Sequence, residues 1–162
     1  MLDKSISQVL VGEKGTDLNL GIIGLGVVGN ALYEGFQGTH DLFVHDISKN
    51  TVITDVIDNC DLAYICVPTP TNDHTGACDI SIVRSVLTLL PRGFSAVIKS
   101  TVVPGTTQSF HEEFPELRIA CSPEFLRASN AREDFANQDI LVIGTHHREL
   151  AEKILDLSLI HI

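Results

Sequence analysis

The 162-residue chain is 44% hydrophobic and carries 21 acidic against 11 basic side chains, a formal charge of −10 at neutral pH. A chain of this length buries roughly 68–70% of its unfolded surface, which is enough for one well-packed domain. So acidic a surface repels phosphate backbones and anionic lipids, which makes nucleic acids and membranes unfavourable partners.

Residues 1–17 are expected to form an N-terminal arm ahead of a single domain over residues 18–162. Within that domain, six short apolar segments recur, and most of them are continuously apolar, as expected of strands that are covered on both faces. These predicted strands are residues 18–24, 41–46, 62–67, 95–101, 117–122 and 139–144.

Helical patterns separate the predicted strands. Val28, Leu32 and Phe36 recur at four-residue spacing, and a short helix fits around residues 54–60. Further on, Asp79 can cap a helix with an apolar face, and a last helix carries Leu150, Ile154 and Leu157. Strands that alternate with helices predict an α/β fold with a doubly wound parallel sheet, a Rossmann-type single domain of about six strands.

The first strand leads directly into GLGVVG, in which Gly24, Gly26 and Gly29 follow the Gly-x-Gly-x-x-Gly pattern. The first glycine permits a tight turn, the second lets backbone approach a pyrophosphate, and the third lets helix and strand pack closely. Val27 and Val28 open the helix that follows, and the N–H groups of this first turn are free to bind the phosphates. This turn predicts a dinucleotide-binding site.

Asp46 ends the second predicted strand about 20 residues further on, where an acidic side chain hydrogen-bonds a ribose 2′-hydroxyl. A carboxylate there repels a 2′-phosphate, which favours NAD over NADP as the cofactor. The alternative interpretation is that Asp46 only starts a turn before Ser48.

Three further stretches stand in the same order as in a known family: VPTPTNDHTGACDIS (67–81), KSTVVPGTT (99–107) and SPEFLRASNAREDFANQDILVIG (122–144). Together with the glycine turn, they make most of residues 19–145 resemble the N-terminal NAD-binding domain of the UDP-glucose/GDP-mannose dehydrogenase family. The resemblance implies NAD-dependent, two-step oxidation of the C6 alcohol of a nucleotide sugar to a uronic acid. It also implies a part in polysaccharide biosynthesis.

The resemblance assigns roles to several residues at predicted strand ends. Three of them would form the wall beside the nicotinamide: Val67, Pro68 and Thr69. Ser100 and Thr101 would face the cofactor, and Thr101 would also help to hold a catalytic water. Ligands bind outside the carboxyl ends of the strands in open α/β sheets, which is where these residues are expected.

Glu124 would match the family's glutamate, which works through that water during thioester hydrolysis. Phe125 and Leu126 would offer backbone contacts to the nucleotide sugar. A purely structural interpretation is also open, because Ser122, Pro123 and Glu124 suit the N-cap and first turn of a helix. We therefore predict that a helix begins here, at the edge where Glu124 can act.

The chain departs from the family's pattern at three places. Ala128 and Ser129 replace a glutamate and a glycine, and the stretch over residues 47–60 is shorter. The family's GGxCxxKD segment with its nucleophilic cysteine, and the lysine of its central helix, do not occur among the 162 residues. A thiol nucleophile is needed for the covalent step, so we expect the chain alone not to complete the oxidation.

Two hypotheses stay open: the NAD-binding domain of a nucleotide-sugar dehydrogenase, or a non-catalytic nucleotide-binding or interaction module. A different dehydrogenase of the hydroxyacid type fits the glycine turn but leaves the later motifs unexplained. The partners implied are a nucleotide sugar, and either a second copy or a missing C-terminal half. In the family the dimer contact runs largely through the central helix, so we expect any oligomer here to be built differently.

Cysteine and histidine usage points to no metal site and to a reducing compartment. Cys60, Cys66, Cys78 and Cys121 show no CxxC spacing, and the seven histidines include no HExxH pattern. With no signal-peptide pattern at the N-terminus, the cysteines are expected to be buried free thiols in a cytoplasmic protein.

Overall fold

The computed structural model describes residues 18–138 and 140–159, so the predicted arm over residues 1–17 lies outside the described residues. Strands and helices alternate along this part of the chain. They are β1 (Leu20–Ile23), α1 (Val27–Phe36), β2 (Leu42–His45), α2 (Ile53–Asn59), β3 (Leu62–Ile65), α3 (Ser81–Leu89), β4 (Ser95–Ile98), α4 (Thr106–Glu113), β5 (Arg118–Cys121), α5 (Ala131–Ala136), β6 (Gly144–Thr145) and α6 (Arg148–Leu159).

The strands form one sheet in the order β2-β1-β3-β4-β5-β6. The first five pair in parallel, with Ile23 of β1 opposite His45 and Ile65, and Ile98 of β4 opposite Cys121. The order reverses at β1, because the chain moves to β2 on one side and then to β3 on the other. The carboxyl ends on either side of such a reversal frame a crevice where ligands bind.

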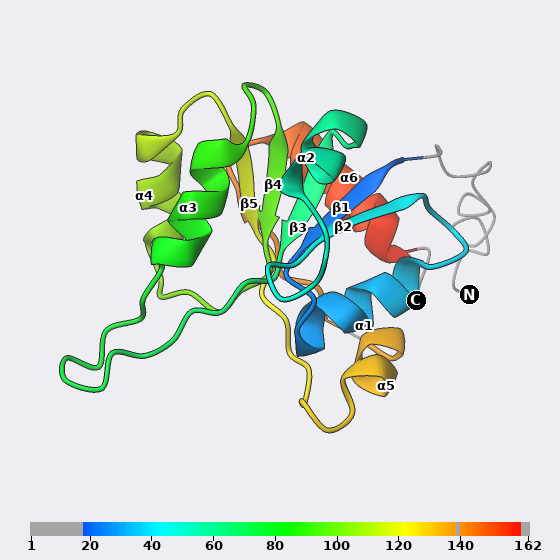
Figure 1. The fold of residues 1–162 in the computed structure, drawn as a ribbon, viewed down its shortest axis with the longest axis horizontal. Coiled ribbons are helices and arrows are strands. Elements are labelled where there is room, and N and C mark those ends of the chain that lie inside the picture. The colour runs from blue at the N-terminus through cyan, green and yellow to red at the C-terminus, as the bar shows by residue number, and fades with distance from the viewer. Residues whose placement is uncertain (1–17, 139, 160–162) are drawn as a thin grey trace, which may run out of the picture.

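Helices cover both faces of the sheet, and each face has its own apolar cluster. Val56 of α2, Val83 of α3 and Phe110 of α4 belong to one cluster. Leu32 of α1 and Ile154 of α6 belong to the other. Figure 1 shows α3 and α4 on one side of the sheet and α1 and α6 on the other. The sheet is therefore doubly wound, as the continuously apolar strands predicted.

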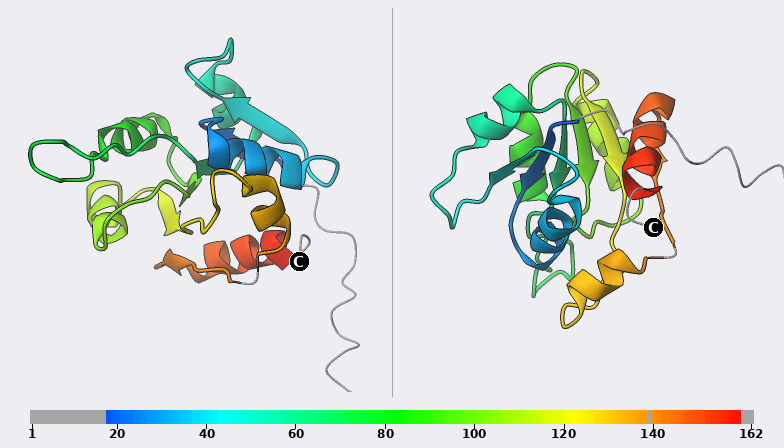
Figure 2. Two further views of the ribbon diagram at one scale, coloured as in Figure 1. Left: turned by 90° about the horizontal axis from the view of Figure 1, so that it is seen from below. Right: turned by 90° about the vertical axis from the view of Figure 1, so that its right-hand side faces the viewer.

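Helix α5 lies beside α1 rather than on the sheet, as both views in Figure 2 show. The contact is close because Gly35 of α1 has no side chain, and a Cβ there would overlap the ring of Phe135. Figure 2 also shows the long segment between β3 and α3 projecting from the body of the domain. Among the described residues, no helix combines the length and the apolar character needed to cross a bilayer.

The predicted α/β doubly wound fold is confirmed, but the sixth strand differs from its prediction. Residues 140–143 are not a strand; β6 consists of Gly144 and Thr145 and pairs antiparallel with β5. A parallel strand needs a crossover that returns the chain to the amino ends of the strands. Here α5 stays beside α1, so the chain enters the sheet from the carboxyl end and runs in the opposite direction.

The predicted helix start at Ser122 is wrong. Residues 122–127 are irregular, and the next helix begins only at Ala131. Ser122 is 1% exposed, and the side chain of Glu124 is drawn into an ion pair inside the protein. These tertiary contacts override the local capping preference of the Ser-Pro-Glu sequence. A separate difference is helix α4, which occupies residues 106–113 ahead of β5 and was not predicted from the sequence.

Candidate functional site

Backbone hydrogen bonds align the carboxyl ends of the parallel strands at one edge of the sheet. Just beyond the strands, Gly24 N–H donates to the His45 carbonyl oxygen at 2.7 Å and Cys66 N–H to that of Ile23 at 2.7 Å. Ser122 N–H likewise donates to the carbonyl oxygen of Ile98 at 3.0 Å. The segments that follow β1, β3, β4 and β5 therefore leave the sheet side by side, where the sequence predicted a binding crevice.

The three glycines of the turn each meet a different steric requirement. Gly24 has φ +94°, and a Cβ there would lie 2.6 Å from the Cys66 carbonyl oxygen. A Cβ on Gly29 would overlap the carbonyl oxygen of Gly24, so α1 packs directly on the turn. A Cβ on Gly26 would meet nothing within 4 Å. Gly26 thus faces open space, the geometry that lets a phosphate approach the backbone.

The N-terminus of α1 is open as well. Gly26 occupies the N-cap position and no side chain caps the helix. The amide of Asn30 instead braces the turn, donating to the carbonyl oxygens of Leu25 at 2.6 Å and Gly26 at 2.9 Å. The first N–H groups of a helix have no partner within the helix, and they bind anions. Asn30 was not predicted from the sequence, because an asparagine in a first turn is an unspecific signal.

The Asp46 carboxylate accepts hydrogen bonds both from the glycine turn and from the turn that Asp46 itself begins. One carboxylate oxygen accepts the Leu25 N–H at 2.6 Å; the other accepts the Ser48 N–H at 2.8 Å and the Ser48 hydroxyl at 2.5 Å. The Ser48 hydroxyl and then the Leu25 N–H lower the pKa of Asp46 from 3.8 to about 2. Asp46 therefore does start a turn before Ser48, while its second oxygen fixes the glycine turn.

The loops after β3 and β4 are joined by two hydroxyl groups. The Ser100 hydroxyl donates to the Val67 carbonyl oxygen at 2.7 Å, and the Thr69 hydroxyl donates to that of Thr101 at 2.6 Å. Ser100 is 7% exposed, so its hydroxyl is committed to the protein interior. Pro68 and Thr101 are exposed. Of the two residues expected to face the cofactor, Thr101 is thus exposed to solvent and Ser100 is not.

Glu124 forms an ion pair that the sequence analysis did not predict. Its Oε2 lies 2.6 Å from Nζ of Lys99, and only 3% and 4% of the respective side chains are exposed. Lys99 follows β4 and Glu124 follows β5, so the pair joins two strand ends. The sequence feature that points to such a pair is the lysine at the end of SAVIK, directly after a mainly apolar strand. A buried lysine needs a partner of opposite charge.

Phe125 and Leu126 line an open groove of about 570 Å³ that also reaches Glu124 and Ile140. Phe125 is 62% exposed to solvent. The neighbouring Arg127 is held by Asp134, with its Nε and its terminal nitrogen 3.0 and 2.6 Å from the two carboxylate oxygens. The ion pair between Arg127 and Asp134 thus fixes the segment that carries Phe125 and Leu126.

Ala128 and Ser129 lie in a second groove, of about 590 Å³, beside the start of α1. Val27 and Asn30 of α1 line the same groove. The two residues that depart from the family's pattern are therefore next to the glycine turn. None of the described residues form a group of three or more His, Cys, Asp or Glu side chains able to hold a metal ion.

Residues 37–158 match the family described as the UDP-glucose/GDP-mannose dehydrogenase family, NAD binding domain. The match covers most of the chain but begins after the glycine turn, so the turn is independent support for the same type of site.

Two relatives agree with this match. A UDP-glucose 6-dehydrogenase of Rickettsia bellii is 34% identical over 107 residues, which are 61% of this chain and 24% of that protein. One of Haloferax volcanii is 29% identical over 132 residues, 71% of this chain and 30% of that protein. The chain thus spans less than a third of the length of these relatives.

Solved structures share the fold. A UDP-glucose dehydrogenase from Pyrobaculum islandicum superposes with a TM-score of 0.78 at 26% identity, covering 91% of this chain and 45% of that one. A GDP-mannose dehydrogenase from Pseudomonas aeruginosa gives a TM-score of 0.74 at 20% identity, covering 85% and 43%.

Proposed function

Because the chain belongs to the UDP-glucose/GDP-mannose dehydrogenase family, as its NAD-binding domain, we propose that the glycine turn and Asp46 hold the dinucleotide. The observation that carries this proposal is the 2.6 Å hydrogen bond from Leu25 N–H to the Asp46 carboxylate. It joins the expected phosphate-binding turn to the expected ribose-binding acid. The open space at Gly26 and the uncapped helix α1 fit a pyrophosphate.

The ribose contact is compatible with the hydrogen bonds that Asp46 already makes. An ionised carboxylate has about four acceptor sites. Three are used by Leu25 and Ser48, which leaves one for a ribose hydroxyl. A 2′-phosphate would meet this negative charge instead, so NAD is the preferred form.

For the complete protein of which such a domain is part, we propose oxidation of the C6 alcohol of a nucleotide sugar in polysaccharide biosynthesis. Bound NAD supplies the hydride acceptor. Val67, Pro68, Thr69 and Thr101 would lie along the nicotinamide. Phe125 and Leu126 would contact the nucleotide sugar from the groove that they line.

Glu124 would act as a base only after its carboxylate is released toward the substrate. Its side chain is 3% exposed and paired with Lys99, which holds the carboxylate away from solvent. Glu124 must therefore exchange this partner, or share it with a water, before it can take a proton from a reacting group.

A second candidate is a nucleotide-binding module without catalysis. Ala128 favours this module, because Ala128 lies beside the start of α1, at a position where the family's pattern has a glutamate. Because the chain alone is expected not to complete the oxidation, the reading frame of the gene separates the two candidates. A frame that continues beyond residue 162 into a GGxCxxKD segment supports the dehydrogenase domain, and a frame that stops there supports the module. For either, we propose the cytoplasm, where the four free cysteines stay reduced.

Calorimetric titration with NAD and with NADP tests the proposed cofactor site. We expect saturable binding of NAD and weaker binding of NADP. Asp46→Asn should narrow the difference between the affinities for NAD and NADP. The control is Asp41→Asn, at an exposed residue before β2, which should leave this difference unchanged. No binding of either cofactor at millimolar concentration contradicts the proposal.

A further inference from the structure

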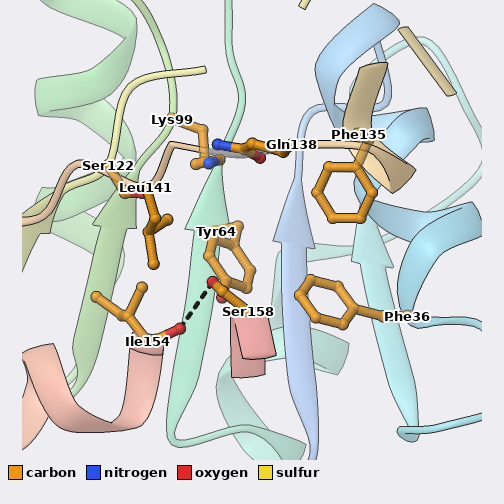
Figure 3. A pocket seen from close by; sticks show the side chains of 9 residues that line it. All are labelled: Phe36, Tyr64, Lys99, Ser122, Phe135, Gln138, Leu141, Ile154 and Ser158. Atoms are coloured by element: carbon orange, nitrogen blue, oxygen red, sulfur yellow. Dashed lines mark hydrogen bonds between the residues drawn. The ribbon is translucent and has the colours of Figure 1, made fainter. Parts of the chain in front are cut away.

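A small cavity lies between the sheet and α6, away from the glycine turn. Its volume is about 30 Å³, and most of its wall is apolar, including Phe36, Tyr64 and Ile154. Figure 3 shows Lys99 and Gln138 together at the end nearest the carboxyl ends of the strands, with Ile154 and Ser158 at the other end. The cavity thus has one end that is polar and charged.

Two polar groups in this wall have unused hydrogen-bonding capacity. The Ser122 side chain belongs to a residue that is 1% exposed, and its hydroxyl has no hydrogen-bond partner among the described residues. The Lys99 ammonium carries three N–H donors. Its partner of opposite charge is a single oxygen of Glu124, 2.6 Å away. Ser122 and Lys99 both line the cavity.

The opposite end of the cavity is satisfied. The Ser158 hydroxyl donates to the Ile154 carbonyl oxygen at 2.9 Å, the bond drawn in Figure 3. At the end near Lys99, the amide nitrogen of Gln138 also has a partner, because it donates to the Ile140 carbonyl oxygen at 2.6 Å. Near this cavity, the buried side-chain atoms without a hydrogen-bond partner are therefore the Ser122 hydroxyl, which lines it, and the two carboxylate oxygens of Glu124, one of which is paired with Lys99.

We propose that this cavity is a binding site for one buried water molecule, which links the Lys99 ammonium to the Ser122 hydroxyl. A buried water needs roughly 10–15 Å³ of free space and two to four polar partners, and cavities that stay empty are apolar. A cavity of about 30 Å³ meets the first requirement and leaves no room for a molecule of ligand size. Lys99 and Ser122 meet the second.

The water has a structural consequence for Glu124. Nearly all buried polar groups in native proteins are hydrogen-bonded, because an unpaired one costs about 1–3 kcal/mol. By accepting a bond from Lys99 and bonding Ser122, the water satisfies both groups and fixes the direction in which the ammonium faces Glu124. The site does not depend on a bound dinucleotide, so it is tested without cofactor.

The first test is a crystal structure of the cofactor-free chain at a resolution that shows ordered solvent. We expect a water within hydrogen-bonding distance, about 2.7–3.2 Å, of both Ser122 Oγ and Lys99 Nζ. A cavity without solvent density, with the Ser122 hydroxyl turned to a protein carbonyl, overturns the proposal.

A solution test counts long-lived internal waters by magnetic relaxation dispersion of the water nuclei. Ser122→Val removes the hydroxyl and fills part of the cavity, so the variant should lose one such water. The control Ser158→Ala removes a hydroxyl that already has a protein partner, and it should retain the wild-type count. An unchanged count in Ser122→Val overturns the proposal. If that variant does not fold, the wild-type crystal structure decides.

Discussion

The Lys99 ammonium and the Glu124 carboxylate face each other at 2.6 Å, with 4% and 3% of their side chains exposed. They come from the ends of β4 and β5, two neighbouring strands. Removing one partner of such a pair leaves an uncompensated buried charge. The two residues therefore depend on each other, whatever role Glu124 has in chemistry.

Lys99→Met should lower the free energy of unfolding by about 3–5 kcal/mol, the usual cost of breaking a buried ion pair from one side. Glu124→Gln should also lower the free energy of unfolding, for the same reason. The double variant should lose clearly less free energy of unfolding than the two single variants together. Urea denaturation of wild type, the two single variants and the double variant measures this coupling between Lys99 and Glu124. The exposed pair Arg84–Glu113, at 42% and 38%, is the control, and Arg84→Met should cost at most about 1 kcal/mol. Additive effects for Lys99 and Glu124 would contradict the buried pair.

Asp46 predicts a loss of stability in acid. Its pKa is lowered from 3.8 to about 2 in the folded chain, first by the Ser48 hydroxyl and then by the Leu25 N–H. The unfolded chain therefore binds this proton first, so the contribution of Asp46 is complete above about pH 3.8 and declines as the pH falls toward 2. The melting temperature of wild type should fall more steeply over this range than that of Asp46→Asn. Parallel curves would exclude this contribution.

His111 predicts a second pH dependence, nearer neutrality. Burial lowers its pKa below 6.5, and the neighbouring His146 and His147 add to the effect, although a backbone hydrogen bond at Ile119 opposes it. The ring centroids of His146 and His147 lie 4.7 and 5.4 Å from that of His111. The unfolded chain gains the proton first as the pH falls below 6.5, so stability is complete above that value and declines below it.

His111→Gln should therefore flatten the dependence of the melting temperature on pH between neutrality and mildly acidic solution. His74→Gln is the matched control, because His74 lies exposed in the loop between β3 and α3. A variant at His111 that keeps the wild-type slope would show that another group causes it.

Much of the fold follows from the sequence, and the exceptions share a physical cause. Continuous apolar segments located β1 to β5, and the spacing of Leu150, Ile154 and Leu157 located α6, all three of which are buried. The misplaced sixth strand and the helix expected at Ser122 both lie after β5. There, tertiary contacts of Phe135 with α1 and of Glu124 with Lys99 decide the path, and local preference does not.

The candidate site divides in the same way. Its glycines could be predicted because their role depends on backbone shape, which the pattern records. The partner of Lys99 and the role of Asn30 could not, because Glu124 is distant from Lys99 in sequence and Asn30 binds backbone atoms that any residue carries. The expected burial of all four cysteines was also wrong in part: Cys60 is buried, and the other three are partly exposed.

The glycine turn offers a pair of variants with opposite expectations. Gly29→Ala places a Cβ on the Gly24 carbonyl oxygen and should cost about 1–3 kcal/mol of stability, as overpacking does. Gly26→Ala meets nothing within 4 Å, so it should cost less than about 1 kcal/mol. Its methyl group nevertheless stands where a pyrophosphate approaches, and NAD binding should weaken at least about tenfold, or ~1.4 kcal/mol. Thermal unfolding and calorimetry separate the two effects; a Gly26→Ala variant with wild-type affinity would contradict the site.

NMR titration of the ¹⁵N-labelled chain with NAD tests whether the cofactor binds at the glycine turn beside Asp46. We expect the amide signals of residues 25–29 and of Asp46 to shift first and to saturate together. Saturable binding whose shifts lie elsewhere, or no shift at millimolar NAD, would contradict binding at this turn.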